Sequence, residues 1–255
     1  MSAPYQIVIP ARMASQRLPG KPLLDIRGKP LVERVYERAC LAGAHRVIIA
    51  TDDQAIERAA RDFGATTVLT SPEHTSGSDR IAECADSLAW SDDTLIVNLQ
   101  GDEPLMPPVC LDQAAELLAG DSSAAVASLY WPIDNATEVE DPNVVKVVTA
   151  ADGSALYFSR SVIPHPRDLE QADATARAGY RWKRHIGLFA YRFGALRAFT
   201  SMAASPLEQV EKLEQLRFLE SGRRIILAEA AEFIPPGVDT PVDLRRVREH
   251  FSSAA

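Results

Sequence analysis

Short apolar runs alternate with helical patterns through the first hundred residues, and this alternation is the strongest restriction on the fold. The expected strands span residues 5–10, 46–51, 66–69 and 94–99. The expected helices between them span residues 31–39, 55–63 and 80–88. Such alternation is typical of a mostly parallel sheet flanked by crossover helices. The pattern therefore predicts a Rossmann-like, doubly wound α/β fold whose ligands bind beyond the carboxyl ends of the strands.

The second half of the chain is less regular. Further strand-like segments span residues 124–131, 144–149, 155–159, 185–192 and 225–227. Residues 163–182 carry proline, charge and polar side chains, so we expect a long mobile loop there. Two amphipathic helices are expected near the end, residues 207–219 with Ser205 as cap and residues 241–251 with Thr240 as cap.

These patterns fit one domain better than two. We expect a single domain over residues 1–255, with a doubly wound core formed by approximately residues 1–125 and 200–255. A mixed α+β insertion would occupy approximately residues 126–199. A chain of 255 residues is long enough to bury a large core of this kind.

The loop after the first expected strand carries three cations, Arg12, Arg17 and Lys21. Fixed cations and backbone amides at the end of a parallel strand form a site for polyphosphates. The loop is not a Walker sequence, because Pro22 follows Lys21 where serine or threonine is required. A solvated basic turn is the alternative interpretation of this loop.

The composition restricts the partners of the protein. Lys and Arg number 27 against 35 Asp and Glu, giving a net charge of −8. This balance argues against general binding to nucleic acid or to anionic membranes. No apolar run approaches the ~20 residues that span a bilayer, and the chain does not open with a basic segment and a long apolar run. We therefore expect a cytoplasmic protein.

Two acids are candidates for holding a divalent cation. Asp102 directly follows the expected strand 94–99, and Mg²⁺ prefers one or two carboxylates together with phosphate oxygens and water. A turn aspartate is the alternative for Asp102. Asp239 precedes the last expected helix, where an ordinary helix cap is the alternative. A shared metal site requires Asp239 to fold back against Asp102.

Other polar residues are candidates for substrate contacts. Arg80 follows a loop rich in hydroxyl groups and is expected to meet a sugar or a nucleotide phosphate, or else to pair with a neighbouring acid. Arg160 ends an expected strand, and a guanidinium group matches a substrate carboxylate. No zinc spacing and no nucleophile elbow are present, so covalent catalysis gains no support.

Nine short segments occur in order along the chain. They are IPARMASQRLPGKPL, ATDD, HTSGSDR, VNLQGDEPL, NVVKVV, ALYFSR, RHIGLFAYR, SPLEQVEKLEQLR and GVDTPVDL. The segments run from residue 9 to residue 244 and so cover nearly the whole chain. Each is weak alone, but the ordered set is specific, and it resembles the 3-deoxy-D-manno-octulosonate (Kdo) cytidylyltransferases, also called CMP-Kdo synthetases.

The resemblance implies a nucleotide-diphospho-sugar-transferase-like fold whose insertion serves dimerisation. It implies CTP and Kdo as substrates, Mg²⁺ as cofactor, and CMP-Kdo and pyrophosphate as products. CMP-Kdo would then feed lipopolysaccharide assembly. Sialic-acid cytidylyltransferases share the opening Pro-Ala-Arg, but their loop usually continues Gly-Ser-Lys, and the Arg17-Leu18-Pro19-Gly20-Lys21 sequence found here favours Kdo. The 8-amino analogue of Kdo is not distinguished.

The resemblance also assigns roles to residues, in four groups. The nucleotide loop falls on Ala11, Arg12, Ser15, Arg17 and Lys21. Further contacts to cytidine and sugar fall on Ser76, Gly77, Arg80 and Gln100. The metal acids fall on Asp102 and Asp239. The sugar pocket falls on Arg160, His185, Tyr191, Glu214 and Gln215.

The mechanism that follows is an in-line attack of the Kdo anomeric hydroxyl on the α-phosphorus of CTP. Charge compensation and alignment are then the main tasks, and Arg12 and Lys21 join Asp102 and Asp239 as the catalytic set. A non-catalytic nucleotide-binding regulator is one alternative, although it does not need paired metal acids. A glycosyltransferase is another, although the cationic loop suits a free triphosphate better.

Overall fold

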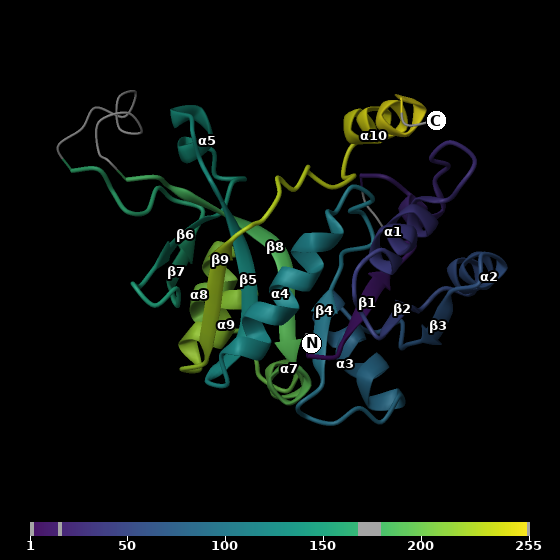
Figure 1. Ribbon diagram of the computed structural model, residues 1–255, viewed down its shortest axis with the longest axis horizontal. Coiled ribbons are helices and arrows are strands. Elements are labelled where there is room, and N and C mark those ends of the chain that lie inside the picture. The colour runs from purple at the N-terminus through teal and green to yellow at the C-terminus, as the bar shows by residue number, and fades with distance from the viewer. Residues whose placement is uncertain (1–2, 15–16, 168–179, 254–255) are drawn as a thin grey trace.

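The computed structural model describes residues 3–14, 17–167 and 180–253 (Figure 1). Within these residues, nine strands form one sheet whose main path has the order β3-β2-β1-β4-β8-β5-β9. Short β6 and β7 extend from β8. The strands are β1 (Tyr5–Ala11), β2 (Arg46–Thr51), β3 (Thr66–Leu69), β4 (Leu95–Asn98), β5 (Ala124–Pro132), β6 (Lys146–Thr149), β7 (Ala155–Ser159), β8 (Lys183–Arg192) and β9 (Arg224–Glu229).

Most neighbouring strands of the main path are parallel. The strands β1, β2, β3 and β4 pair in parallel, as do β5 and β9. Only β8 runs antiparallel to its neighbours on this path, β4 and β5. The predicted doubly wound α/β fold is confirmed, with β8 as the reversed strand.

Helices cover both faces of the sheet. Among the described residues, none of them is long and apolar enough to cross a membrane. The helices and one short turn are α1 (Leu31–Cys40), α2 (Gln54–Asp62), α3 (Gly77–Ser87), α4 (Pro108–Gly120), α5 (Ala136–Glu140), α7 (Phe193–Thr200), α8 (Pro206–Glu211), α9 (Gln215–Glu220), α10 (Pro241–Ser253) and the 3₁₀ turn η1 (Lys21–Leu23).

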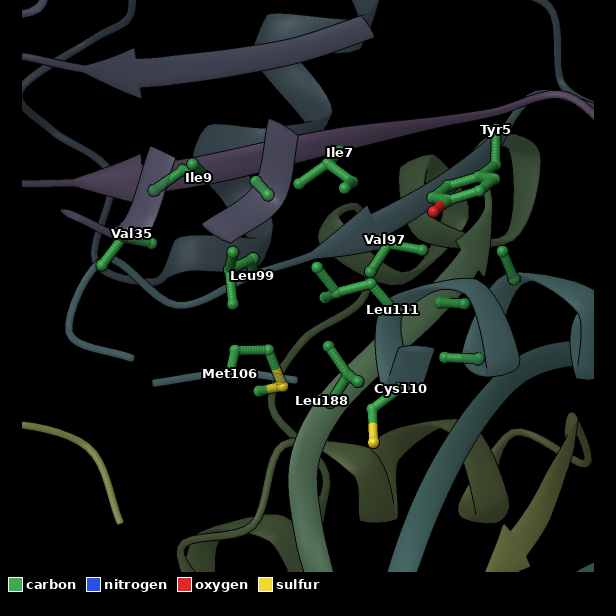
Figure 2. Close-up of a cluster of buried hydrophobic side chains, with 14 of the residues drawn as sticks. Tyr5, Ile7, Ile9, Val35, Val97, Leu99, Met106, Cys110, Leu111 and Leu188 are labelled. Atoms are coloured by element: carbon green, nitrogen blue, oxygen red, sulfur yellow. The ribbon is translucent and has the colours of Figure 1, made fainter. Parts of the chain in front are cut away.

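Alternating side chains of β1 pack into the core on the two opposite faces of the sheet. Ile7 and Ile9 lie on one side and join a cluster with residues of α1, α2 and α4, which Figure 2 shows around Val97 and Leu111. Val8 lies on the other side and joins a cluster with α3, α7 and α9. Successive strand residues point to opposite faces, so this single buried strand supports both helical layers.

The expected helix 207–219 is wrong as one element. Ser205 caps α8 with a reciprocal hydrogen-bond pair to Glu208, as predicted, but α8 ends at Glu211. Lys212 then adopts a left-handed conformation with φ of 56°, and α9 starts afresh at Gln215. A left-handed residue cannot continue a right-handed helix, so the segment turns at this point.

The expected insertion over residues 126–199 is also wrong in its extent. Most of β5 and all of β8 fall inside that range, yet both strands belong to the main sheet. The part that stands off the main path lies between them and includes α5, β6 and β7 (Figure 1). The core therefore takes in strands from the middle of the chain.

The expected mobile loop 163–182 ends in well-packed structure. Residues 168–179 lie outside the described residues, but Trp182 is buried and its Nε1 donates a hydrogen bond to the Pro164 carbonyl, 3.2 Å away. Its ring also meets that of Tyr180 edge to face. The end of the segment therefore packs against its beginning.

Candidate active site

The loop after β1 borders a cavity of about 820 Å³ beyond the carboxyl end of the sheet, called here the first cavity. The turn after β4 and the segment before α10 line the same space. Loops that follow parallel strands thus meet at one edge, as the alternation of elements predicts. The lining residues are Pro10, Ala11, Arg12, Ala14, Arg17, Lys21, Pro22, Gln100, Gly101, Asp102 and Asp239.

The ammonium group of Lys21 joins the two candidate acids in this cavity. Its Nζ lies 2.6 Å from Asp102 Oδ2 and 3.1 Å from Asp239 Oδ1. Arg17 Nη2 lies 3.3 Å from the second oxygen of Asp239. Burial lowers the pKa of Lys21, but the two carboxylates raise it, and the net shift is upward. Lys21 is therefore held as a cation between the acids.

A backbone contact brings Asp239 to Asp102. The amide of Val238 donates to the Asp102 carbonyl at 2.8 Å. At Gly237 a Cβ atom would lie 3.1 Å from that same carbonyl oxygen, so glycine permits the close approach. Thr240, the residue after Asp239, forms reciprocal hydrogen bonds with Asp243 and caps α10 as predicted. Asp239 is thus fixed between a backbone anchor and a helix start.

The turn after β4 lies close against the end of β1. A Cβ atom at Gly101 would lie 2.8 Å from the Pro10 carbonyl oxygen, a separation that no side chain tolerates. Glycine at this position therefore lets Asp102 reach the loop that carries Lys21.

Glu103 adds a third carboxyl group behind the first cavity, which the sequence interpretation did not single out. Its Oε2 is buried and has no hydrogen-bond partner among the described residues. Burial first, and then the charges of Asp102 and Asp239, raise the pKa of Glu103 to about 8. Glu103 is therefore mostly protonated at neutral pH, and the negative charge at this end of the cavity comes from Asp102 and Asp239.

A smaller, second cavity of about 190 Å³ is lined by residues of β8, α3 and α9. Gln100 lines both cavities and so marks where they meet. The other lining residues are Gly77, Ser78, Asn98, Phe189, Tyr191, Phe199, Lys212, Leu213, Glu214, Gln215 and Phe218.

Tyr191, Glu214 and Gln215 were predicted for a sugar pocket, and all three line the second cavity. The Tyr191 ring stacks on Phe189, and burial raises the pKa of its hydroxyl above the usual value. Burial also raises the pKa of Glu214, whose Oε2 accepts a hydrogen bond from Ser78 Oγ at 3.0 Å. The cavity therefore combines aromatic faces with hydroxyl, carboxyl and amide groups.

Arg80, expected to contact a nucleotide or a sugar or else to pair with a neighbouring acid, lines neither cavity. It is 2% exposed, donates a hydrogen bond to Thr70 Oγ1, and forms an ion pair with Asp52 at 2.8 Å. Thr70 and Asp52 follow β3 and β2. Arg80 thus joins the start of α3 to the ends of two strands.

Arg160 also turns away from both cavities. Its Nε donates to the Glu211 carbonyl at 2.8 Å and its Nη1 to the Pro142 carbonyl at 3.0 Å. The Glu211 carboxylate accepts the Arg160 backbone amide at 2.9 Å. Arg160 therefore braces the end of α8, next to the turn at Lys212 that lines the second cavity.

The remaining predicted residues have varied positions. Ser76 caps α3 through Asp79 and lines neither cavity, whereas Gly77 beside it lines the second. His185 lies behind the second cavity, with Gln215 Nε2 3.4 Å from its Nδ1. Ser15 lies outside the described residues. Ala11 and Arg12 line the first cavity, and Arg12 Nη1 also reaches the Thr75 carbonyl at 3.5 Å.

Sequence reasoning missed Ser78, Asn98 and Lys212, which line the second cavity. Asn98 offered a signal in the sequence, because a polar residue closes an otherwise apolar strand. In the structure its Oδ1 is buried without a hydrogen-bond partner among the described residues. Ser78 stands beside Gly77 in a segment already singled out. Lys212 gave no signal, since its place depends on the left-handed turn.

The fold and the two adjoining cavities define an α/β protein of the nucleotidyltransferase class. A basic loop suits a polyphosphate, paired acids suit a divalent cation, and the second cavity suits a small polar acceptor. The chain belongs to the cytidylyltransferase family, whose model matches residues 6–225, and within it to the 3-deoxy-manno-octulosonate cytidylyltransferases.

Relatives and a solved structure carry this assignment. The chain is 52% identical to the 3-deoxy-manno-octulosonate cytidylyltransferase of Chromohalobacter salexigens, over 95% of this chain and 94% of that protein. It is 50% identical to the same enzyme of Halorhodospira halophila, over 99% of both. The structure of CMP:2-keto-3-deoxy-manno-octonic acid synthetase complexed with CTP matches with a TM-score of 0.90 and 40% identity, covering 99% of this chain and all of that one.

Proposed function

We propose that this protein transfers CMP from CTP to Kdo, giving CMP-Kdo and pyrophosphate. The observation that carries the proposal is the pair of adjoining cavities, one with a basic loop and paired acids and the other with polar and aromatic groups. A triphosphate in the first cavity and a sugar acid in the second would meet beside Gln100, which lines both.

The basic loop would hold the phosphates of CTP. Three cations line the first cavity, Arg12, Arg17 and Lys21. Both Arg17 and Lys21 pair with Asp239, and the side chain of Lys21 is the more buried of the two. These cations would hold the β- and γ-phosphates and stabilise the charge on departing pyrophosphate. No covalent step on the protein is required.

Asp102 and Asp239 fit a hard divalent cation such as Mg²⁺. Their carboxylates already converge on one positive centre, the Lys21 ammonium, and carboxylate oxygens are ligands that Mg²⁺ prefers. When bound, the ion would neutralise charge on the phosphates and favour ionisation of the attacking hydroxyl. We therefore propose these two acids as the residues that hold it.

The second cavity would orient the sugar acid. Tyr191 presents a face and a hydroxyl, while Glu214 and Gln215 offer partners for sugar hydroxyl groups. We also propose that the protein acts as a cytoplasmic homodimer that supplies CMP-Kdo for lipopolysaccharide assembly. The family supports this last proposal, and light scattering of the purified protein tests the dimer.

The decisive experiment is pyrophosphate release from CTP with Kdo, with and without Mg²⁺. Reactions with sialic acid, with 8-amino-Kdo and without any sugar are the controls. Release that requires both Kdo and Mg²⁺ would support the proposal. CTP binding by folded protein without release under any of these conditions would instead favour the nucleotide-binding regulator.

A further inference from the structure

Ser128 lies in the main sheet behind the second cavity, and its side chain is fully buried on β5. It sits at an irregular point of the pairing with β8, where Ser128 pairs with Phe189 and the next residue, Leu129, pairs with Ile186. Gly187 and Leu188 are therefore extra residues of β8 at this bulge. Such bulges often redirect a side chain near a functional site.

The Ser128 hydroxyl has two carbonyl neighbours at the bulge. Its Oγ lies 3.0 Å from the Ile186 oxygen and 2.8 Å from the Leu188 oxygen. Both oxygens only accept hydrogen bonds, so the single hydroxyl proton is directed to one of them. The Oγ atom can then only accept a hydrogen bond from a third neighbour.

That third neighbour is the ring of His185. Its Nε2 lies 2.8 Å from Ser128 Oγ, and it carries the proton of this hydrogen bond when the hydroxyl donates to one of the two carbonyl oxygens. The ring packs against Phe158 and Phe189, with ring centres 4.8 and 5.2 Å apart. Burial lowers the pKa of His185 to about 3, so the ring is neutral at neutral pH and its Nδ1 carries no proton.

An unprotonated Nδ1 accepts a hydrogen bond, and it faces the amide of Gln215. Gln215 Nε2 lies 3.4 Å from Nδ1 and so donates to it. The other end of the amide, Oε1, is then the group that Gln215 can offer to the second cavity, which it lines. If the Gln215 amide were reversed, its acceptor Oε1 would face the acceptor Nδ1 of His185, and no hydrogen bond could form between them.

We infer that Ser128 is a positioning residue, which acts through the tautomer of His185 to turn the acceptor oxygen of Gln215 toward a substrate hydroxyl in the second cavity. The inference rests on the proposed function for the identity of the substrate. The relay from Ser128 to Gln215 does not depend on that identity, because it follows from the hydrogen-bond distances and from the neutral ring of His185.

The first test measures the tautomer in the wild-type protein, without any substitution. ¹⁵N-labelled histidine gives separate NMR signals for the two ring nitrogens of each of the five histidines, and the variant His185→Gln identifies the signals of His185. We expect a protonated Nε2 and an unprotonated Nδ1. The opposite tautomer would overturn the relay, whatever the enzyme acts on.

The second test measures kinetics of Ser128→Ala, with Ser128→Thr as the variant that keeps a hydroxyl. We expect the KM for Kdo to rise about tenfold in Ser128→Ala while the KM for CTP stays close to the wild-type value. Ser128→Thr should recover most of the loss. An equal change for both substrates would indicate a structural effect and contradict the inference.

A double-mutant cycle separates action through Gln215 from an independent effect. In a Gln215→Ala background, Ser128→Ala should raise the KM for Kdo by less than twofold further, because the amide it orients is gone. Full additivity would overturn the inference. Failure of the proposed function can be told apart from failure of the relay. If the proposed function were wrong, the wild-type protein would release no pyrophosphate with Kdo, but the expected tautomer of His185 would still be observed.

Discussion

The Nζ atom of Lys21 lies 2.6 Å from Asp102 Oδ2, so a cation from the basic loop already contacts the acid proposed to hold Mg²⁺. Asp239 contacts the same ammonium group. A metal ion that enters this space must displace Lys21 or share the carboxylates with it. Triphosphate binding would draw Lys21 toward phosphate oxygens and so make room for the ion.

Replacing Lys21 by methionine should therefore strengthen metal binding in the absence of nucleotide. Removing one charge at this distance is worth ~1–4 kcal/mol, so we expect the affinity for Mn²⁺, used as a probe, to rise about fivefold or more. Electron paramagnetic resonance titration of nucleotide-free protein measures it. Arg12→Met is the matched control, since Arg12 lines the cavity but contacts the Thr75 carbonyl. Unchanged affinity in Lys21→Met would contradict the competition.

Asp102→Asn should reduce turnover by about a hundredfold or more while the fold persists, because an amide is a weaker ligand for a divalent cation than a carboxylate. Pyrophosphate release measures the rate, and circular dichroism checks the fold. Asp134→Asn is the control, because that carboxylate is 72% exposed and, among the described residues, forms its ion pair with Arg181, which is also exposed. Near-normal turnover in Asp102→Asn would remove Asp102 from the metal site.

Arg80→Leu should reduce stability rather than substrate affinity. The change leaves the Asp52 carboxylate without its buried partner, and breaking such a pair costs roughly 3–5 kcal/mol in the free energy of unfolding. Urea denaturation measures the loss. In Arg181→Leu, which removes a pair with Asp134 that is exposed on both sides, we expect little change. A raised KM with normal stability would return Arg80 to the substrate site.

His185 should make the protein less stable in acid. Its folded-state pKa is about 3, whereas the unfolded chain binds the proton near the ordinary value of about 6.5. Between these values the unfolded state holds more protons, so stability falls as pH drops from about 6.5 toward 3. Urea denaturation at several pH values should show His185→Gln losing stability less steeply than the wild type. His45→Gln, at an exposed position, should retain the wild-type slope.

The alternation of elements was enough to predict the sheet, because each crossover helix must pack on a neighbouring parallel strand. It did not reveal α4, whose buried and small residues give only a weak amphipathic pattern. The break at Lys212 was equally hidden, since lysine rarely adopts the left-handed conformation. The reversal of β8 depends on which strands pair, which a single sequence does not state.

The first cavity was the more predictable of the two. Its cations and Asp102 follow strands whose carboxyl ends share an edge, so topology alone brings them together. Asp239 needed the Val238 amide on the Asp102 carbonyl, a contact between distant segments. Arg80 and Arg160 look like substrate ligands in sequence, but their partners Asp52 and Glu211 become neighbours only in the folded chain.

Lys21 and Asp239 are in contact although 218 positions separate them in the sequence. The parts of this site are therefore synthesised at different times. The basic loop is synthesised first and Asp102 later. Asp239 follows only after β9, the final strand of the described chain. A nascent chain therefore lacks one of its two acids until the sheet has been synthesised in full. Asp102 and Asp239 can therefore share the Lys21 ammonium group only after β9 and the segment that follows it have been synthesised.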